Sequence, residues 1–251
     1  MMDTKKVYLS LLKKYGQQGW WPLFITQDTN NKTHRDWRVE NGLTYGISYL
    51  DLKKHQTGFR DPCFEIAVGA ILTQNTAWKN VAVAIINLYK AKALTPQKLL
   101  KLPTAKLQKL IRPAGYFRQK TKKLKLFAEW LIKNHDGEIK QLGRSPSSVL
   151  RSLLLARWGI GRETADSIIL YALNKPVFVI DEYTRRLCRR YGVEFEDYDE
   201  YRQFFEKAFL KQNYSKQRLS KIYQEYHGLI VRAEKIFPSP RQRRGRRPSR
   251  L

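Results

Sequence analysis

Apolar residues recur at helical spacing along most of the chain, and the pattern begins sharply after Asp61-Pro62. Between Phe64 and Leu72 they fall at positions i, i+3, i+4, i+7 and i+8, which is the spacing of one buried helix face. Asp61 is placed to cap this helix, and Pro62 is tolerated in its first turn. The pattern predicts a helix that starts at about residue 62 and is interrupted by the polar run Thr73-Gln74-Asn75-Thr76.

The rest of the chain repeats this pattern, so the predicted fold is almost entirely helical. Further helices are predicted over residues 7–15, 117–135 and 182–191 and, as a pair, over 201–235. Others are predicted to begin at Trp78, after Thr95-Pro96, after Pro103-Thr104, after Ser145-Pro146 and at Arg162. Gly137 is expected to end the helix over 117–135, because glycine readily follows a helix C-terminus.

Two segments do not fit the helical pattern. Residues 23–60 are rich in Thr, Asn, Gly and aromatic residues, and we interpret them as an irregular insertion with one short strand from Tyr45 to Leu50. The last residues, 238–251, form a Pro/Arg/Ser tail that cannot build a core. Its arginines would add salt-sensitive affinity for a nucleic acid, independent of base sequence.

The charge of the chain indicates its partner. With 251 residues, 42% of them hydrophobic, the chain can bury one sizeable core or two smaller ones. It has 48 Lys and Arg against 22 Asp and Glu, a formal net charge of +26, which predicts a polyanionic partner without distinguishing DNA from RNA. No signal-peptide core and no stretch of membrane-spanning length is present, so we expect a soluble protein with no membrane partner.

The two cysteines, Cys63 and Cys188, stand far apart, each without a second Cys nearby. This spacing excludes a four-thiolate zinc or iron–sulfur site and gives no disulfide framework. We interpret both as small, buried apolar residues in a reducing cytoplasm.

A glycine hairpin separates two of the predicted helices. Gly159-Ile160-Gly161 is followed at once by Arg162, Glu163 and Thr164, which open the second helix. Glycines allow positive φ and the close approach of a phosphate, and the free N–H groups of the first helical turn then hold the anion. Ile160 is expected to pack back between the helices. An ordinary helix–turn–helix corner is the alternative explanation for Gly-x-Gly alone.

A single carboxylate, Asp181, follows the second helix of the hairpin after a short apolar run. Breaking an N-glycosidic bond builds positive charge on the sugar, and an ionised Asp stabilises this cation or orients the attacking water. Asp181 stands at a predicted helix start, where the helix dipole favours the ionised form. A plain helix N-cap, a common role of Asp, is the alternative.

These residues resemble a known family. Gly-Ile-Gly-Arg-x-Thr-Ala at 159–165, followed by Val-Ile-Asp-x-Tyr at 179–183, is similar to the endonuclease III type of helix–hairpin–helix DNA glycosylase, a likeness that extends over roughly residues 64–191. The family implies an all-α, two-lobed fold with the active cleft between the lobes. It implies that Asp181 is the catalytic carboxylate and that a DNA phosphate is bound by Gly159, Ile160, Gly161, Arg162 and Thr164.

The resemblance also implies a division of the chain. In this family a six-helix lobe carries the hairpin, and a second lobe is made from both chain ends. Applied to this sequence, the first lobe would cover 64–173, the second would combine 1–63 with 174–237, and the basic tail would follow at 238–251.

Two departures from the family pattern change the expected chemistry. Where bifunctional relatives have a lysine that attacks the sugar as a Schiff-base nucleophile, this chain has Glu163, which cannot form an imine. The resemblance therefore implies a monofunctional enzyme that uses water and has no AP lyase step; a surface position without a role is the alternative for Glu163. The four cluster-binding cysteines of many members are absent, so neither an iron–sulfur cluster nor another cofactor is expected, and only a monovalent cation at the hairpin is left open.

Three further segments, Trp20-Trp21-Pro22, Leu72–Trp78 and Arg112–Tyr116, are similar to the branch of the family that excises alkylated purines, typically 3-methyladenine. Such an enzyme flips the nucleotide out of the duplex, and an electron-poor alkylpurine favours a slot between aromatic rings. The resemblance gives Trp20 and Trp78 as the two faces of that slot, with Trp21 and Pro22 shaping its wall. Core packing is the alternative for each Trp.

The polar break between the first two helices supplies candidates for a DNA wedge. Gln74 and Asn75 lie there, and their amides would fill the gap left by the extruded base; a capping role or a buried amide network is the alternative. A cationic run from Arg118 to Lys125 is either a solvated surface or a set of phosphate contacts.

The main hypothesis is a monofunctional DNA glycosylase of base excision repair, acting as a monomer on double-stranded DNA that contains base lesions. It would be cytoplasmic, and associated with the bacterial nucleoid while on DNA. One alternative is a glycosylase, or glycosylase/AP lyase, for a mismatched pyrimidine or an oxidised base. The other is a non-catalytic DNA-binding protein of the same fold. Asp181 argues against the latter, because a buried carboxylate that faces a polyanion weakens binding.

Overall fold

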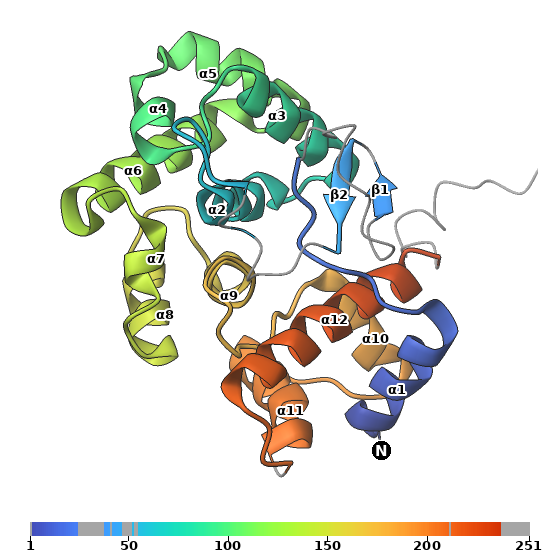
Figure 1. Cartoon of the computed structure of the whole chain (residues 1–251). Coiled ribbons are helices and arrows are strands. Elements are labelled where there is room, and N and C mark those ends of the chain that lie inside the picture. Colours follow the sequence, from blue (N-terminus) through green and yellow to red (C-terminus); the bar gives the residue numbers. More distant parts are fainter. Residues whose placement is uncertain are drawn as a thin grey trace, which may run out of the picture.

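The computed structural model describes residues 2–24, 38–40, 42–46, 52, 55–210 and 212–236. This part of the chain is almost entirely helical, as predicted (Figure 1). Its elements are α1 (Thr4–Tyr15), β1 (Arg38–Glu40), β2 (Leu43–Tyr45), α2 (Pro62–Thr73), α3 (Trp78–Lys90), α4 (Pro96–Lys101), α5 (Thr104–Ile111), the short turn η2 (Arg112–Ala114), α6 (Phe117–His135), α7 (Ile139–Leu142), α8 (Ser147–Leu155), α9 (Arg162–Ser167), the π-helical turn η3 (Ile168–Ala172), α10 (Glu182–Arg190), α11 (Tyr198–Leu210) and α12 (Lys216–Glu234).

Local sequence signals set where several helices begin and end. Asp61 accepts hydrogen bonds from two free N–H groups of α2, at 2.8 and 3.4 Å, and Pro62 occupies the first turn, as predicted. At the end of α6, Asp136 (φ 52°) and Gly137 (φ 74°) both adopt the left-handed conformation that terminates a helix. The prediction that Gly137 ends this helix is confirmed. The four-residue helix α7 was not predicted, because a single turn leaves no periodic pattern.

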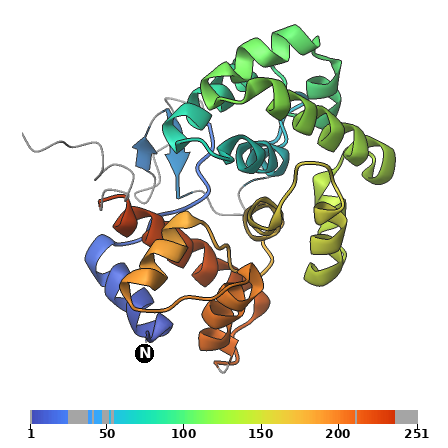
Figure 2. The ribbon, with the colours of Figure 1, turned by 180° about the vertical axis from the view of Figure 1, so that it is seen from behind.

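Helix α2 is the central helix of the larger lobe, which is formed by the elements from α2 to η3. Its residues 62–72 are all buried, and it packs against α3, α6, α7, α9 and η3 (Figures 1 and 2). A helix that is apolar on almost every face belongs in a core. Cys63 on α2 and Cys188 on α10 are free and buried, and burial raises the pKa of each thiol to about 12. Both cysteines are therefore core residues, as interpreted from the sequence.

The two ends of the described chain meet in the smaller lobe. Helix α1 lies against α11 and α12, and α12 lies against α10, as both views of the ribbon show (Figures 1 and 2). Helix α12 also contacts η3 of the larger lobe. The C-terminal helix α12 thus lies at the boundary between the two lobes. The residue numbers of the domain boundaries remain predictions.

The insertion at 23–60 is described in part. Strands β1 and β2 form one antiparallel pair, and Thr44 of β2 also pairs with Leu23 through two main-chain hydrogen bonds of 2.9 and 2.7 Å. The strand expected from Tyr45 to Leu50 overlaps β2 at Tyr45, and its residues 47–50 lie outside the described part, so the prediction stays untested there. All three residues of β2 are buried, so no alternation of apolar and polar positions marked it.

The insertion is attached to the core by a buried ion pair. Arg60 donates to Glu65 of α2 at 2.6 Å, and the same carboxylate accepts a hydrogen bond from the main-chain N–H of Phe24 at 3.0 Å. The predicted tail at 238–251 lies outside the described residues. Within the described residues, none of the helices is long and apolar enough to cross a membrane.

Candidate active site

The glycine hairpin connects α8 to α9. Gly159 has a φ of 79°, in the left-handed region that disfavours other residues. Gly161 has φ −92° and ψ 178°, which any residue adopts, and no heavy atom of the described chain lies within 4 Å of where its Cβ would stand. Among the described residues, no side chain caps the N-terminus of α9. The hairpin therefore combines a turn that requires glycine at Gly159 with open backbone at Gly161.

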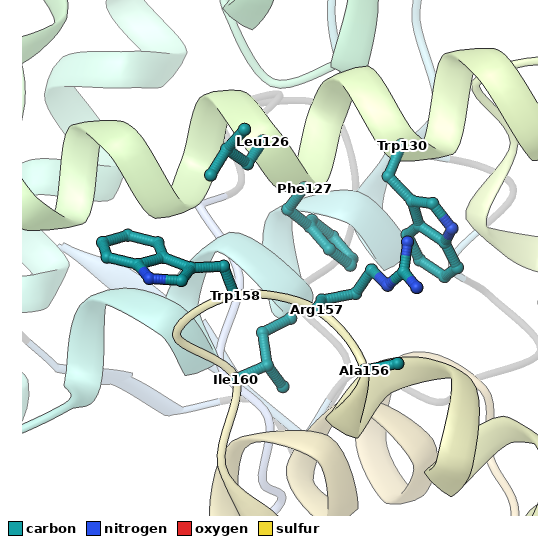
Figure 3. Close-up of a pocket in the computed structure, with 7 residues that line it drawn as sticks. All are labelled: Leu126, Phe127, Trp130, Ala156, Arg157, Trp158 and Ile160. Atoms are coloured by element: carbon teal, nitrogen blue, oxygen red, sulfur yellow. The ribbon is translucent and has the colours of Figure 1, made fainter.

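A cavity of about 160 Å³ lies between the hairpin loop and α6. Ile160 is 6% exposed and lines this cavity together with Phe127 and Trp130 of α6 (Figure 3). Trp158, at the other end of the cavity, is half exposed and has the Nζ atom of Lys122 4.5 Å from its ring centre. Ile160 thus packs inward, as expected, but it faces α6, which supports the hairpin from behind.

Gln74, in the loop between α2 and α3, connects that loop to the glycine hairpin. Its Nε2 donates to the carbonyl of Gly159 at 3.0 Å and to Oγ1 of Thr164 at 2.9 Å, and its Oε1 accepts from Nζ of Lys123. In this DNA-free structure the amide of Gln74 belongs to the network that was its alternative, and the wedge role stays a prediction. Asn75 is exposed with φ 52°, so it also remains a wedge candidate.

The hairpin side chains are occupied within the protein. Arg162 pairs with Asp197 at 2.5 Å and lies 3.7 Å from a carboxylate oxygen of Asp199, while Thr164 is 6% exposed and accepts from Gln74. That these residues bind a DNA phosphate stays a prediction, and the donors left for a phosphate are main-chain N–H groups, as predicted for the first turn of this helix.

Lys120 of α6 is a buried lysine. Its Nζ donates to the carbonyl of Leu72, Oγ1 of Thr76 and the carbonyl of Ala114, each at 2.8 Å. Burial and the nearby charge of Lys123 lower the pKa of Lys120 to about 8. Within the cationic run, Lys120 is therefore neither a phosphate contact nor a solvated residue; it joins the loop after α2 to the η2 turn.

Asp181 is the N-cap of α10 and is largely enclosed by protein. Its Oδ1 accepts from the main-chain N–H of Thr184 at 2.7 Å and from the Thr184 hydroxyl at 2.9 Å, and its Oδ2 lies 3.4 Å from Nε2 of His227. Burial alone would raise the pKa of this carboxyl, but the His227 and Thr184 contacts outweigh burial and lower it. Asp181 is therefore both the cap that was its alternative and an ionised carboxylate.

His227 and Tyr171 form the contacts behind Asp181. Nδ1 of His227 lies 2.7 Å from the hydroxyl of Tyr171, and His227 is 8% exposed. No role was predicted for His227, because it stands on a helix 46 positions beyond Asp181, in a segment with no motif. Tyr171 was part of the extended hairpin match, yet the match did not show that the π-helical turn η3 carries its ring to α12.

A cluster of aromatic rings adjoins this carboxylate. Trp20 contacts Trp21 (ring centres 5.7 Å apart), Trp78 (5.1 Å) and Tyr45 of the insertion (5.7 Å), and Trp21 contacts Tyr171 at 5.2 Å. The rings therefore run without interruption from the insertion to Tyr171, whose hydroxyl bonds to His227. The two halves of the site predicted from sequence, the Trp residues and Asp181, are brought together.

The predicted slot between Trp20 and Trp78 is not present in this arrangement. Their ring planes meet at 63°, and Trp78 also lies edge-on to Trp21 at 5.0 Å and 89°, whereas a sandwiched base needs two parallel rings roughly 7 Å apart, twice the stacking distance in DNA. Trp78 (8% exposed), Trp21 (9%) and Pro22 are buried, and Trp20 is only partly so. Core packing, the alternative explanation, describes Trp78 as it stands here.

Two helix glycines make room for the indoles. A Cβ at Gly69 of α2 would lie 3.0 Å from the Trp21 ring, and a Cβ at Gly228 of α12 would lie 2.5 Å from the Trp20 ring. Real Cβ atoms do not approach so closely without displacing their neighbours. The positions of both rings thus depend on glycine in helices from two different lobes.

Glu163 stands at the first turn of α9 and senses the Asp181 charge. Glu163 is exposed, but desolvation of its carboxyl by the surrounding chain and the nearby charge of Asp181 raise its pKa to about 7. A surface carboxylate without neighbours would not be shifted in this way. Glu163 therefore belongs to the surroundings of Asp181.

Comparison with known proteins identifies the family. The chain matches the HhH-GPD superfamily of base excision DNA repair proteins over residues 68–225. It is 37% identical over 236 residues to a protein of Methanocaldococcus jannaschii whose name describes a candidate DNA repair glycosylase, covering 92% of this chain and 87% of that protein. It is 29% identical over 132 residues to an endonuclease III of Thermotoga maritima, covering 53% of this chain and 57% of the relative.

Solved structures agree with the sequence relatives. A 3-methyladenine DNA glycosylase of H. pylori, bound to 1,N6-ethenoadenine, superimposes with a TM-score of 0.63 at 31% identity, covering 76% of this chain and 94% of that one. A trapped endonuclease III–DNA covalent intermediate gives a TM-score of 0.58 at 19% identity, covering 92% and 86%, and supports the fold alone. Sequence, fold and site agree: the chain is a DNA glycosylase of base excision repair with DNA as its partner, and it belongs to the HhH-GPD superfamily, in the endonuclease III type.

Proposed function

We propose that this glycosylase is monofunctional and releases N-alkylated purines, such as 3-methyladenine, from nucleotides flipped out of duplex DNA. The observation that carries the proposal is an ionised carboxylate, Asp181, joined through His227 and Tyr171 to a cluster of indole rings. The 31% identity with a 3-methyladenine DNA glycosylase supports the same choice of lesion.

Asp181 supplies the charge that the reaction needs. As the bond between C1′ and the purine nitrogen breaks, its electron pair goes to the purine and the deoxyribose becomes a cation. The lowered pKa of Asp181 keeps the carboxylate negative at neutral pH, and a negative group fixed beside the sugar stabilises that cation. Water then adds to C1′ and loses a proton, which leaves an abasic site.

An alkylated purine suits the aromatic cluster. Such a base is often cationic, so its bond to C1′ breaks without prior protonation, and its electron-poor ring is attracted to the face of an indole. Trp20 is the partly exposed indole of the cluster, so we assign the stacking face to Trp20, with Trp21 and Pro22 behind it. Stacking on one aromatic side chain contributes about 1–3 kcal/mol per base.

Glu163 determines which product is left. A carboxyl group does not form an imine with C1′ in either protonation state, so no strand-cutting step follows base release. The proposed enzyme therefore leaves the abasic strand intact, uses no cofactor, and binds the flanking phosphate through the open backbone at Gly161.

The first test is a panel of duplexes, each with one defined lesion: an alkylated purine, a mismatched thymine or an oxidised guanine. After single-turnover incubation, half of each sample is treated with alkali to cut at abasic sites. We expect cleavage of the alkylated duplexes, and only after alkali. Release of thymine or oxidised guanine in their place would overturn the choice of lesion, and cleavage without alkali would overturn the monofunctional mechanism.

Asp181→Asn tests the carboxylate. Asn is as good an N-cap as Asp, so the start of α10 should be preserved. We expect base release to slow by about 100-fold or more, the scale on which one preorganised charge acts, with no loss of affinity for the duplex. Unchanged release would remove Asp181 from the mechanism.

Borohydride trapping tests the absence of an imine. An endonuclease III provides the positive control, since a trapped covalent DNA intermediate of such an enzyme is known. We expect no adduct with this chain and an adduct with Glu163→Lys, which places an amine at the same position. An adduct with the unchanged chain would mean that another amine attacks the sugar.

A further inference from the structure

We propose that His227 is a positioning residue for base release: the Tyr171 hydroxyl fixes the ring hydrogen of His227 on Nε2, and this N–H holds the second oxygen of the Asp181 carboxylate in place. The inference depends on the proposed role of Asp181. It assigns a function to a residue that carried no signal in the sequence.

The tautomer follows from the partners of the ring. Burial and the nearby charges of Asp181 and Glu225 raise the pKa of Tyr171 well above its ordinary value, so the hydroxyl keeps its hydrogen. That hydrogen can go to Nδ1 of His227 at 2.7 Å or to the carbonyl of Gln224 at 3.3 Å. The shorter contact has the usual length of a bond donated by a hydroxyl. A neutral His227 that accepts at Nδ1 has its hydrogen on Nε2.

The Nε2 hydrogen completes the set of donors around the carboxylate. Oδ1 of Asp181 already has two donors from Thr184, whereas Oδ2 has Nε2 of His227 at 3.4 Å. At that distance Nε2 makes no hydrogen bond among the described residues of this structure, and contacts in DNA-free active sites commonly shorten when substrate binds. Without His227, one oxygen of Asp181 would be free to turn away from the sugar.

The frame behind His227 is built to hold this geometry. Gln224, one helical turn before His227 on α12, donates through Nε2 to the carbonyl of Leu170 at 2.8 Å and to Oδ1 of Asn174 at 3.2 Å. These contacts tie α12 to the π-helical turn η3 that carries Tyr171. A π turn commonly marks a functional position; here it directs the Tyr171 hydroxyl to His227.

The charges around His227 determine what its loss does to the reaction. The groups that act directly on His227 are Asp181 at the N-cap of α10, Tyr171 of η3 and, through its charge, Glu163 of α9. Around them, Glu182 and Arg185 of α10 act on Glu163, and Glu225 of α12 acts on Tyr171. Since His227 counters the desolvation of Asp181, its removal should make that carboxyl easier to protonate. The acid limb of the rate profile should then move to higher pH.

The test compares His227→Phe with His227→Gln, whose amide N–H can take the place of Nε2–H. Base release from a duplex with one alkylated purine is measured under single-turnover conditions between pH 3 and 9, with the enzyme-free rate subtracted, and affinity is measured on a duplex with an uncleavable abasic analogue. We expect His227→Phe to be about 10- to 100-fold slower, as for a lost hydrogen bond to a charged group, with unchanged affinity and the shifted acid limb. His227→Gln should recover at least half of that loss on a logarithmic scale. Equal rates and acid limbs for His227→Phe and the unchanged protein would overturn the proposal.

A second measurement needs no catalysis. The chain has four histidines, so the ring nitrogens of His227 can be assigned in ¹⁵N-labelled protein by comparison with His227→Gln. At pH 8 we expect the tautomer with the hydrogen on Nε2, and Tyr171→Phe should shift the population toward the hydrogen on Nδ1. A hydrogen on Nδ1 in the unchanged protein would refute the inference while leaving the proposed function intact. Failure of the protein to release any alkylated base would instead refute the proposed function.

Discussion

Gly161→Ala separates the role of the hairpin in DNA binding from its role in folding. Gly161 has a backbone conformation that alanine adopts freely (φ −92°, ψ 178°), and no heavy atom of the described chain lies within 4 Å of the added Cβ. The substitution removes flexibility from the unfolded chain at no cost to the folded one, which stabilises a protein by about 0.4–1 kcal/mol. For a chain of this size the melting temperature should rise by roughly 1–4 °C.

The same Cβ would stand where a phosphate approaches the N-terminus of α9. If the phosphate is held by main-chain N–H groups, Gly161→Ala should keep it at a distance and remove one hydrogen bond to a charged group. Such a bond contributes about 1.5–3 kcal/mol, so the Kd for a duplex with an abasic analogue should increase about 10- to 150-fold. The variant would therefore be more stable than the unchanged protein and bind DNA more weakly.

Two other glycines supply the comparison. Gly58 also has open space around a Cβ and no positive φ, so Gly58→Ala should give a similar small gain in stability with unchanged DNA affinity. Gly159→Ala should do the opposite, because φ 79° and contacts of 2.6–2.9 Å with the Lys123 side chain strain any Cβ there. Melting curves and fluorescence-anisotropy titrations at one fixed salt concentration measure both properties. If Gly161→Ala binds DNA as tightly as Gly58→Ala, the phosphate is not held at the open backbone of Gly161.

Three further predictions concern single side chains. The pKa of Glu163, raised to about 7, exceeds its unfolded value, so the folded chain retains a proton that the unfolded chain has lost. The free energy of unfolding therefore falls as the pH rises to 7. The difference in melting temperature between Glu163→Gln and the unchanged protein should favour the variant more at pH 8 than at pH 5. The pKa of Lys120, lowered to about 8, is below its unfolded value, so its contribution makes stability rise above pH 8; denaturant melts at pH 7 and 10 should show a smaller rise for Lys120→Met. Trp20→Ala should lower the rate of alkylpurine release at low enzyme concentration by about 5- to 150-fold, because one stacking face is lost. Trp20→Phe should keep most of the rate of the unchanged protein. Equal rates for the two variants would exclude stacking on Trp20.

Most helices could be predicted from sequence because each buries one face. The start of α2 carried both its apolar period and its capping residue Asp61, and the structure has the helix there. The π-helical turn η3 could not be predicted, since residues 162–172 continue the pattern of an α-helix. Its distinguishing bond, from the N–H of Leu173 to the carbonyl of Ile168 at 3.2 Å, lies where this turn contacts α12, a helix from the far end of the chain.

The candidate site was predictable where its parts are close in sequence. The hairpin and Asp181 are about twenty residues apart and keep the spacing of the family. The arrangement of the indoles was not predictable, because the angle between Trp20 and Trp78 depends on the space left by Gly69 and Gly228 in helices that are distant in sequence. Gln74 shows the same limit: a polar residue between two helices suggests a wedge or a network, and only the position of Gly159 shows that its amide joins a network in this structure.

Helix α12 connects the two chemical parts of the site. Within one turn, the Glu225 carboxylate accepts hydrogen bonds from the main-chain N–H groups of Gln18 and Gly19, His227 faces Asp181, and Gly228 accommodates Trp20. Because an α-helix moves as a rigid rod over a single turn, a shift of α12 must displace the indole face and the carboxylate contact together. Helix α12 packs against α1, α10 and η3, and two of its tyrosines contact Phe205 and Phe209 of α11. Core substitutions where α12 packs against α1, α10 and α11 that leave the chain folded should therefore slow base release more than they weaken the hold on flanking phosphates, because the hairpin is also supported by α6.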